Sequence, residues 1–230
     1  MSIADNVRYV YERIESAATR AGQTAENISL VAATKMNDAA RVREAIEAGI
    51  KIIGENRVQE FLEKDAMDAY TGAERHFIGH LQRNKVKFVA GICDLIQSVD
   101  SVDLMNQISA KAVERGQRQR ILLEVNIGRE EAKSGVLTEN LENLFAAAEN
   151  LEGISVEGLM TIPPVSEKIT ETCNYFDTMY NLFVDIRAKK YDNINMRILS
   201  MGMSHDYEEA ILSGANMVRV GTAIFGQRHY

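Results

Sequence analysis

Short apolar runs alternate with longer amphipathic segments along the whole chain. The apolar runs, each about the length of a strand, lie at 29–35, 51–55, 76–80, 95–99, 120–127, 155–162, 196–201 and 217–225. The amphipathic segments between them, where apolar residues recur at helical spacing, lie at 38–48, 58–69, 82–90, 101–115, 138–150, 166–189 and 204–213. This alternation is typical of βα units, whose strands lie side by side in a parallel sheet.

Polar residues and glycines mark the ends of several predicted helices. Four segments contain, at or near their start, a residue that commonly caps a helix N-terminus: Asp38, Ser101, Thr138 and Ser204. Four segments are followed by a glycine, as is common just past a helix C-terminus: Gly49, Gly91, Gly116 and Gly214. These signals support the helical interpretation.

Eight predicted strands indicate a single (β/α)8 barrel of the TIM type. Only residues 226–230 follow the last strand, too few for an eighth helix, but residues 2–21 have apolar positions at helical spacing. We therefore expect this N-terminal helix to fill the empty place in the outer ring. An open doubly wound sheet is the alternative. No linker or low-complexity tract divides the sequence, which predicts one domain over residues 1–230.

The composition narrows the functional classes. The chain is 46% hydrophobic and 26% charged, as expected of a globular protein, and its net charge of −7 argues against a general nucleic-acid binder. No apolar run approaches the length of a membrane span, and the N-terminal segment lacks the apolar core of a secretory signal. The two cysteines, Cys93 and Cys173, fit neither a disulfide framework nor a metal site. We expect a cytoplasmic protein.

Polar residues gather where the predicted strands end. In a barrel of this kind the chemistry belongs at the C-terminal ends of the strands. The polar residues at or near those ends are Thr34, Lys35, Glu55, Asn56, His80, Asp100, Glu124, Asn126, Thr161, Ser204, Arg219 and Thr222. Polar residues at one end of an otherwise apolar set of strands predict a binding or catalytic site at that end.

The turns after the last two strands predict a phosphate site. One turn reads Gly202-Met203-Ser204 and leads into a predicted helix, and the other contains Gly221-Thr222. Glycine permits close approach of the backbone, and a helix that begins near Ser204 offers unpaired N–H groups to an anion. The loops after strands seven and eight are a frequent phosphate site of this fold. Plain turns, with Ser204 only as a cap, are the alternative.

Arg219 shares a strand face with Met217 and Gly221, since side chains alternate along a strand. If Gly221 faces the ligand, Arg219 points into the barrel as well. A buried guanidinium stays charged and needs an acceptor. The two candidates for that acceptor are the carboxylate of Glu124 and a ring nitrogen of a ligand.

Lys35 stands at the end of the apolar run "SLVAATK". Burial disfavours a charged lysine, and a lysine of lowered pKa can form a Schiff base with a carbonyl compound. A lysine, a phosphate cradle and a partner for a ring nitrogen at one barrel mouth are the features that hold pyridoxal 5′-phosphate (PLP). An exposed lysine just past a strand is the alternative.

Several sequence blocks together resemble the pyridoxal phosphate homeostasis protein family. They are "LVAATK", "GENRVQE", "HFIGHLQRNK", "EVNIGREEAKSG", "GLMTIPP", "LSMGMSHDYEEAI" and "VRVGTAIFG", and the match runs from about residue 5 to the C-terminus. This family resembles the barrel domain of alanine racemase and other fold-type III PLP proteins. The resemblance implies that Lys35 holds PLP as a Schiff base and that Arg219 faces the pyridine nitrogen. It also implies further cofactor-binding residues: Asn56, Met203, Ser204, Gly221 and Thr222.

The resemblance further implies a non-catalytic role in PLP (vitamin B6) homeostasis. An arginine at the ring nitrogen keeps that nitrogen unprotonated and makes the ring a poorer electron sink. The chain also has no second domain to supply the opposing base of a racemase. We expect a monomer that binds PLP, with PLP-dependent apo-enzymes as candidate recipients and neither nucleic acid nor membrane as partner.

Two other functions fit the same residues. One is a PLP-dependent amino-acid racemase or lyase, which would need a general base facing Lys35. The other is a Schiff-base aldolase acting on a sugar phosphate without a cofactor. Two polar residues have no assigned role: His80 borders the pocket or is a plain polar residue, and Lys133 is a second transient PLP attachment point or a surface lysine.

Overall fold

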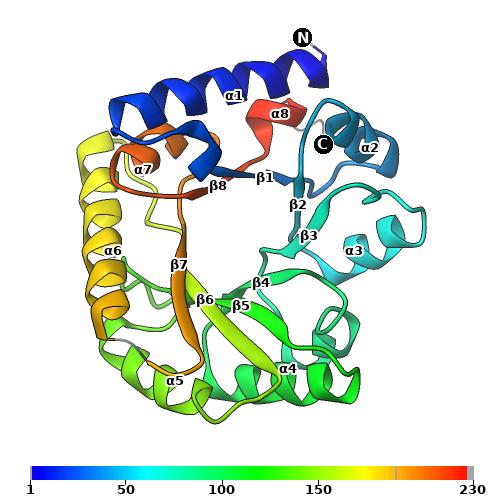
Figure 1. The fold of residues 1–230 in the computed structure, drawn as a ribbon. Helices are drawn as coiled ribbons and strands as arrows, with labels where there is room; N and C mark the ends of the chain where they lie inside the picture. The colour runs from blue at the N-terminus through cyan, green and yellow to red at the C-terminus, as the bar shows by residue number, and fades with distance from the viewer. Residues whose placement is uncertain (1, 190, 227–230) are drawn as a thin grey trace.

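The computed structural model describes residues 2–189 and 191–226 of the chain. Its strands close into one parallel barrel and follow one another in sequence order, as Figure 1 shows. They are β1 (Ser29–Ala33), β2 (Ile52–Glu55), β3 (Glu74–Phe77), β4 (Leu95–Val99), β5 (Gln119–Val125), β6 (Ile154–Thr161), β7 (Ile194–Ser200) and β8 (Met217–Val220). The barrel prediction is confirmed, and the open doubly wound alternative is wrong because β1 pairs directly with β8.

Helices surround the barrel on its outside. They are α1 (Ile3–Arg20), α2 (Ala39–Glu47), α3 (Val58–Asp65), α4 (Val102–Glu114), α5 (Leu141–Ala148), α6 (Ile169–Lys189), α7 (Tyr207–Leu212) and α8 (Thr222–Phe225). Three short 3-10 helices accompany them: η1 (Ala25–Asn27), η2 (Arg83–Phe88) and η3 (Thr138–Asn140). Helix α1 lies between α7 and α2 and covers α8, so it fills the outer ring as predicted (Figure 1).

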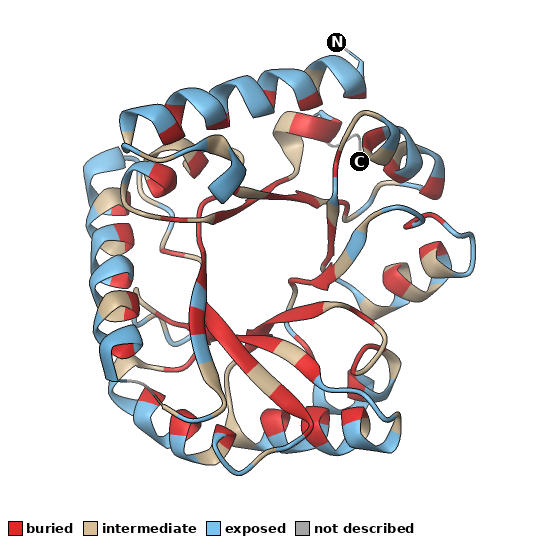
Figure 2. Ribbon diagram, in the orientation of Figure 1, coloured by how far each residue is buried: buried red, intermediate tan, exposed pale blue. Residues whose placement is uncertain are grey.

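The core has two layers, one inside the barrel and one between the barrel and the helices. The inner layer is a cluster of Val31, Ile78, Leu95, Leu122, Met160, Ile198 and Met217. The outer layer is larger and includes Phe61, Phe145 and Phe176, which are fully buried. Figure 2 shows the strands mostly buried and the helices buried on their inner faces alone.

The eighth strand and the residues that follow it differ from the strand predicted at 217–225. Strand β8 ends at Val220, and the next residues form the short helix α8, in which Ile224 and Phe225 both donate to the carbonyl oxygen of Gly221. The predicted strand is therefore too long, because a short eighth helix occupies its last residues, and the prediction that no helix forms in 226–230 falls almost wholly outside the described residues. This turn brings backbone N–H groups to the barrel mouth.

Most predicted helix ends are confirmed. The side chains of Asp38 and Ser101 accept hydrogen bonds from backbone N–H groups of the helices that they cap. Gly49, Gly91, Gly116 and Gly214 follow their helices with positive φ angles. The predictions for Thr138 and Ser204 are wrong: Thr138 lies inside η3, and α7 begins only at Tyr207 with Asp206 as its cap residue.

Candidate functional site

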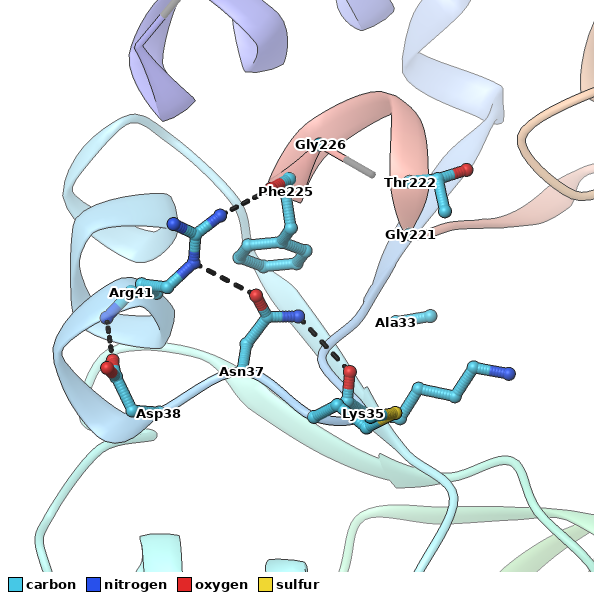
Figure 3. Close-up of a pocket in the computed structure, with 10 residues that line it drawn as sticks. Ala33, Lys35, Asn37, Asp38, Arg41, Gly221, Thr222, Phe225 and Gly226 are labelled. Carbon is cyan, nitrogen blue, oxygen red and sulfur yellow. Dashed lines mark hydrogen bonds between the residues drawn. The ribbon is translucent and has the colours of Figure 1, made fainter. Parts of the chain in front are cut away.

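Lys35 lies in the turn just beyond β1, at the C-terminal end of the barrel. The strand ends two residues earlier than predicted, and the turn continues through Met36, whose φ is 62°. Asn37 Nδ2 donates to the carbonyl oxygen of Lys35 at 3.2 Å, and Arg41 Nε donates to Asn37 Oδ1 at 3.0 Å. Figure 3 shows these contacts below the main chain of α8. Helix α2 therefore fixes the backbone from which the lysine side chain extends.

A buried ion pair supports the same turn from behind. Lys64 Nζ lies 2.8 Å from Glu55 Oε1 and donates to the carbonyl oxygen of Thr34 at 2.9 Å. The Thr34 hydroxyl also donates to Glu55 Oε1, and the Tyr70 hydroxyl donates to it at 3.1 Å. Burial raises the pKa of Glu55, and the Lys64 charge opposes that rise. The peptide before Lys35 is thus held by Glu55, one of the polar residues at the predicted strand ends, and by Lys64, which the sequence did not indicate.

A cavity of about 400 Å³ lies beside this turn. Its lining includes three residues of the predicted site: Lys35, Gly221 and Thr222. In Figure 3 the Lys35 side chain extends past Ala33, on the side where Gly221 and Thr222 lie. The structure therefore brings the predicted lysine and one of the two predicted phosphate turns to a single cavity.

Ser204 joins the two predicted phosphate turns. Its hydroxyl oxygen accepts hydrogen bonds from the backbone N–H groups of Gly221, at 3.0 Å, and Ala223, at 3.4 Å. A side chain at Gly221 would place its Cβ 3.2 Å from the carbonyl oxygen of Ala33, which is tighter than most such contacts. Next to Ser204, the Met203 N–H donates to Asp206 Oδ1 at 2.6 Å. The loops after β7 and β8 are thus adjacent, as the phosphate-site prediction requires.

Arg219 points into the barrel and is only 4% exposed. Its Nη1 donates to Ser200 Oγ at 2.6 Å and its Nη2 donates to the carbonyl oxygen of Thr161 at 2.8 Å. Burial lowers the pKa of Arg219 to about 10, so the guanidinium remains charged at neutral pH. A guanidinium has five N–H groups, and within the described residues these two contacts account for its side-chain hydrogen bonds.

Glu124 does not form the direct ion pair with Arg219 that was one of the two predicted outcomes. No carboxylate lies within salt-bridge distance of Arg219 in residues 2–189 and 191–226. Glu124 is nevertheless 7% exposed and interacts with Arg219 through space. Burial, together with the charge of Asp100, raises the pKa of Glu124 to about 7, and Arg219 opposes that rise. The mouth of the barrel thus contains a carboxyl group that ionises near neutral pH.

Asn56 follows β2 and does not line the cavity beside Lys35. Its Oδ1 atom is buried and accepts no hydrogen bond from a described residue. Its backbone lies against Gly79, where an added Cβ would be 2.1 Å from the Asn56 carbonyl oxygen. A buried acceptor without a partner is unfavourable unless a ligand satisfies it.

His80 and Lys133 take part in contacts around the loop after β5. His80 Nδ1 lies 3.1 Å from Ser134 Oγ. Lys133 Nζ lies 2.5 Å from Glu130 Oε2 and donates to the carbonyl oxygen of Pro163 at 3.1 Å. No three metal-ligating side chains come together within the described residues, and no helix there is long and apolar enough to cross a membrane.

Comparison with known proteins adds independent information. The model of the alanine racemase N-terminal domain family matches residues 6–229. The pyridoxal phosphate homeostasis protein of Aquifex aeolicus (strain VF5) is 42% identical over 230 residues, which cover 100% of both chains. Its Escherichia coli (strain K12) counterpart is 38% identical over 232 residues, which cover 99% of this chain and 97% of the relative.

A solved structure gives the same result in three dimensions. PipY of Synechococcus elongatus, solved with PLP bound, superposes with a TM-score of 0.82 at 31% sequence identity. The superposition covers 94% of this chain and 100% of that one. The family resemblance found in the sequence blocks is therefore confirmed over almost the whole chain, and the protein belongs to the pyridoxal phosphate homeostasis protein family.

Proposed function

We propose that this protein binds PLP at the C-terminal mouth of its barrel, holds it covalently on Lys35, and serves as a PLP reservoir rather than as an enzyme. The observation that carries the proposal is the convergence of Lys35, Gly221 and Thr222 on one cavity. Membership of a family named for pyridoxal phosphate homeostasis supports it, as does the PLP bound to the related PipY.

The residues at the mouth fit the chemical groups of PLP. The Ser204 hydroxyl accepts from the N–H groups of Gly221 and Ala223 and keeps its own proton to donate to a phosphate, which could also take over those two N–H groups. Thr222 and Met203 border the same turns. The charged guanidinium of Arg219 suits an unprotonated ring nitrogen, and Asn56 has a buried oxygen in need of a donor.

Lys35 supplies the covalent contact. Its neutral amine attacks the aldehyde carbon of PLP, a C=N bond replaces the C=O bond, and one molecule of water leaves. Bound PLP would supply an electrophilic carbon and an electron sink. The Glu55–Lys64 pair and Asn37 hold the backbone on either side of Lys35, so the amine starts from a fixed position.

Arg219 is the reason for proposing a non-catalytic role. A cation beside the ring nitrogen disfavours its protonation, and an unprotonated ring withdraws electrons poorly. The pKa of about 10 keeps Arg219 charged at neutral pH. Among the residues that line the cavity beside Lys35 there is no tyrosine to act as an opposing base.

A PLP-dependent racemase or lyase is the second candidate function, and Glu124 is the observation that favours it. A buried carboxyl with a pKa of about 7 can accept a proton at neutral pH. If the PLP-loaded protein racemises amino acids and Glu124→Gln abolishes that activity, the racemase function replaces the reservoir function. An absence of racemisation and lyase activity supports the reservoir.

The decisive experiment is the absorption spectrum before and after borohydride reduction, followed by mapping of the labelled peptide. We expect a visible band that borohydride removes, with the pyridoxyl group on Lys35. Lys35→Ala should lose the reducible band and still hold some PLP non-covalently, whereas the exposed Lys168→Ala should behave like the parent. A colourless protein that takes up no PLP, or a label on another lysine, would refute the assignment.

Delivery of PLP to apo-enzymes is the biological role proposed for the reservoir. The loaded protein should reactivate a PLP-dependent apo-enzyme faster than the same concentration of PLP presented with the Lys35→Ala variant. Reactivation that follows the free PLP concentration alone would argue against delivery. We also propose that the protein acts as a monomer in the cytoplasm, which sedimentation and cell fractionation test.

A further inference from the structure

A chain of buried hydrogen bonds leads from Arg219 into the interior of the barrel. Arg219 on β8 donates to the hydroxyl oxygen of Ser200 on β7 at 2.6 Å. Ser200 in turn donates to Oε1 of Gln97 on β4 at 2.7 Å. Gln97 and Ser200 are both completely buried. Strands β4 and β7 are not neighbours in the sheet, so this contact crosses the inside of the barrel.

The same chain continues to the N-terminal end of the barrel. Gln97 Nε2 lies 3.0 Å from Nδ1 of His76 on β3, and His76 Nε2 lies 3.2 Å from Glu74 Oε2. His76 is 1% exposed, whereas about half of the Glu74 side chain is exposed. Hydrogen bonds therefore connect the proposed cofactor site to the opposite opening of the barrel.

The donors and acceptors fix the direction of every bond in this chain. Arginine only donates, so Ser200 Oγ accepts from Arg219 and its single proton goes to Gln97 Oε1. The amide therefore presents its NH₂ group to His76 Nδ1, which must accept. The remaining ring nitrogen, Nε2, carries the proton and donates to Glu74.

A reversed amide leaves the chain incomplete. Its NH₂ group would then face Ser200 Oγ, and the Ser200 proton would lose its acceptor. His76 would carry its proton on Nδ1, and the lone pair of Nε2 would face the Glu74 carboxylate. Only a neutral His76 with its proton on Nε2 satisfies all members.

We propose that Gln97, anchored by neutral His76, is a positioning residue that fixes how Arg219 is presented to the ring nitrogen of bound PLP. This role rests on the proposed function. Gln97 Oε1 accepts the hydrogen bond of the Ser200 hydroxyl, so the oxygen of that hydroxyl is oriented to accept from Arg219. The Thr161 carbonyl supplies the second fixed contact of the guanidinium.

The charges around His76 come from several elements. Glu74 lies on its own strand, Asp94 precedes β4, and Arg120 belongs to β5. Arg197 of β7 lines the same cavity as His76 at the N-terminal end of the barrel. Burial lowers the pKa of His76 and outweighs the attraction of Glu74, in agreement with the neutral ring that the hydrogen-bond directions require.

The first test uses the protein without PLP and the variant Gln97→Glu. A carboxylate has the shape of the amide and only accepts, so His76 must then carry protons on both ring nitrogens. Nitrogen NMR at about pH 7.5, where an ordinary histidine is neutral, should show the Nε2–H form in the parent and a doubly protonated ring in the variant. The signal is assigned by its absence in His76→Phe. A parent ring protonated on Nδ1, or on both nitrogens, would overturn the chain.

The second test measures the effect on bound PLP. Ser200→Ala removes the link to Arg219 and leaves Gln97 with His76, so the histidine stays neutral while the pH dependence of the PLP absorption band changes. PLP affinity should fall about tenfold, as for one lost hydrogen bond to a charged group. Gln97→Leu should also weaken PLP binding and change the pH dependence of the absorption band. This variant is used instead if the Gln97→Glu protein does not fold.

The matched control is Gln119→Leu. Gln119 is also a buried barrel glutamine, but it bonds to Gly91 and Cys93 outside the site. The Gln119→Leu substitution should lower the stability of the protein and leave the PLP spectrum unchanged. A spectrum unaffected by Ser200→Ala and Gln97→Leu, or equally affected by the control, would overturn the positioning role. A parent protein that binds no PLP would refute the proposed function, and the NMR result would still decide the hydrogen-bond chain.

Discussion

Glu124→Gln should remove a penalty in stability that grows as the pH rises. Glu124 is 7% exposed, and burial with the charge of Asp100 raises its pKa from 4.5 to about 7 in the folded protein. The folded state therefore holds the proton more tightly than the unfolded chain does. The carboxyl lowers stability progressively as the pH rises from about 4.5 to about 7, and the loss is complete above that range.

The size of the effect follows from the same pKa values. A rise from 4.5 to about 7, at about 1.4 kcal/mol for each pH unit, corresponds to about 3 kcal/mol of lost stability at high pH. Glutamine has almost the same shape and does not ionise. The free energy of unfolding of the variant, minus that of the parent, should therefore rise by about 3 kcal/mol between acidic and basic pH.

Urea unfolding followed by far-ultraviolet circular dichroism is the suitable assay, because the chain contains no tryptophan. Curves for parent and variant are measured across the range from about pH 4.5 to about pH 8.5. Glu139→Gln is the control: Arg129 lowers the pKa of Glu139, so its difference from the parent stays constant above the ordinary value of 4.5. If the difference in unfolding free energy between Glu124→Gln and the parent is also independent of pH, the raised pKa of the buried Glu124 carboxyl is refuted.

Two further predictions concern the supports of the site. Lys64→Met leaves Glu55 buried without its partner and should lower stability by about 3–5 kcal/mol in urea unfolding. Arg83→Met, which breaks an exposed pair, should lower it by less than about 1 kcal/mol, and equal losses would contradict the argument. Gly79→Ala brings a methyl group against the Asn56 carbonyl and should displace Asn56, so PLP titration should show weaker binding. An unchanged PLP affinity would show that Asn56 does not contribute to the site.

The barrel could be predicted from the sequence because most of its strands contain a short apolar run that is followed by a turn and an amphipathic segment. The end of the chain could not, because "GTAIF" continues the apolar run of β8 without a break. In the structure Gly221 turns the chain, its carbonyl accepts from the N–H groups of Ile224 and Phe225, and Ser204 from another loop accepts from Gly221. That last contact depends on two loops far apart in sequence, which no local pattern reports.

The candidate site shows the same division. Lys35 and Gly221 could be placed together from their positions at strand ends, and the structure puts both on one cavity. The protein partners of Arg219 could not be predicted, because the sequence offered only the carboxylate of Glu124 or a ring nitrogen of a ligand as its acceptor. Its partners are the neutral groups Ser200 Oγ and the Thr161 carbonyl. Neutral residues inside strands carry little signal until the register of the barrel is known.

The interior of the barrel combines two demands that oppose each other. Apolar residues such as Val31, Leu95 and Leu122 would suffice to fill it, and a buried polar chain adds stability only when every member has a partner. Each bond in the chain that runs from Arg219 to His76 joins a donor to an acceptor, and the N–H groups of Arg219 that neither this chain nor the Thr161 carbonyl uses remain for a ligand. Neutral groups can therefore hold the charged guanidinium in place at the mouth, while Glu124 and Asp206 act on it through space without a direct ion pair.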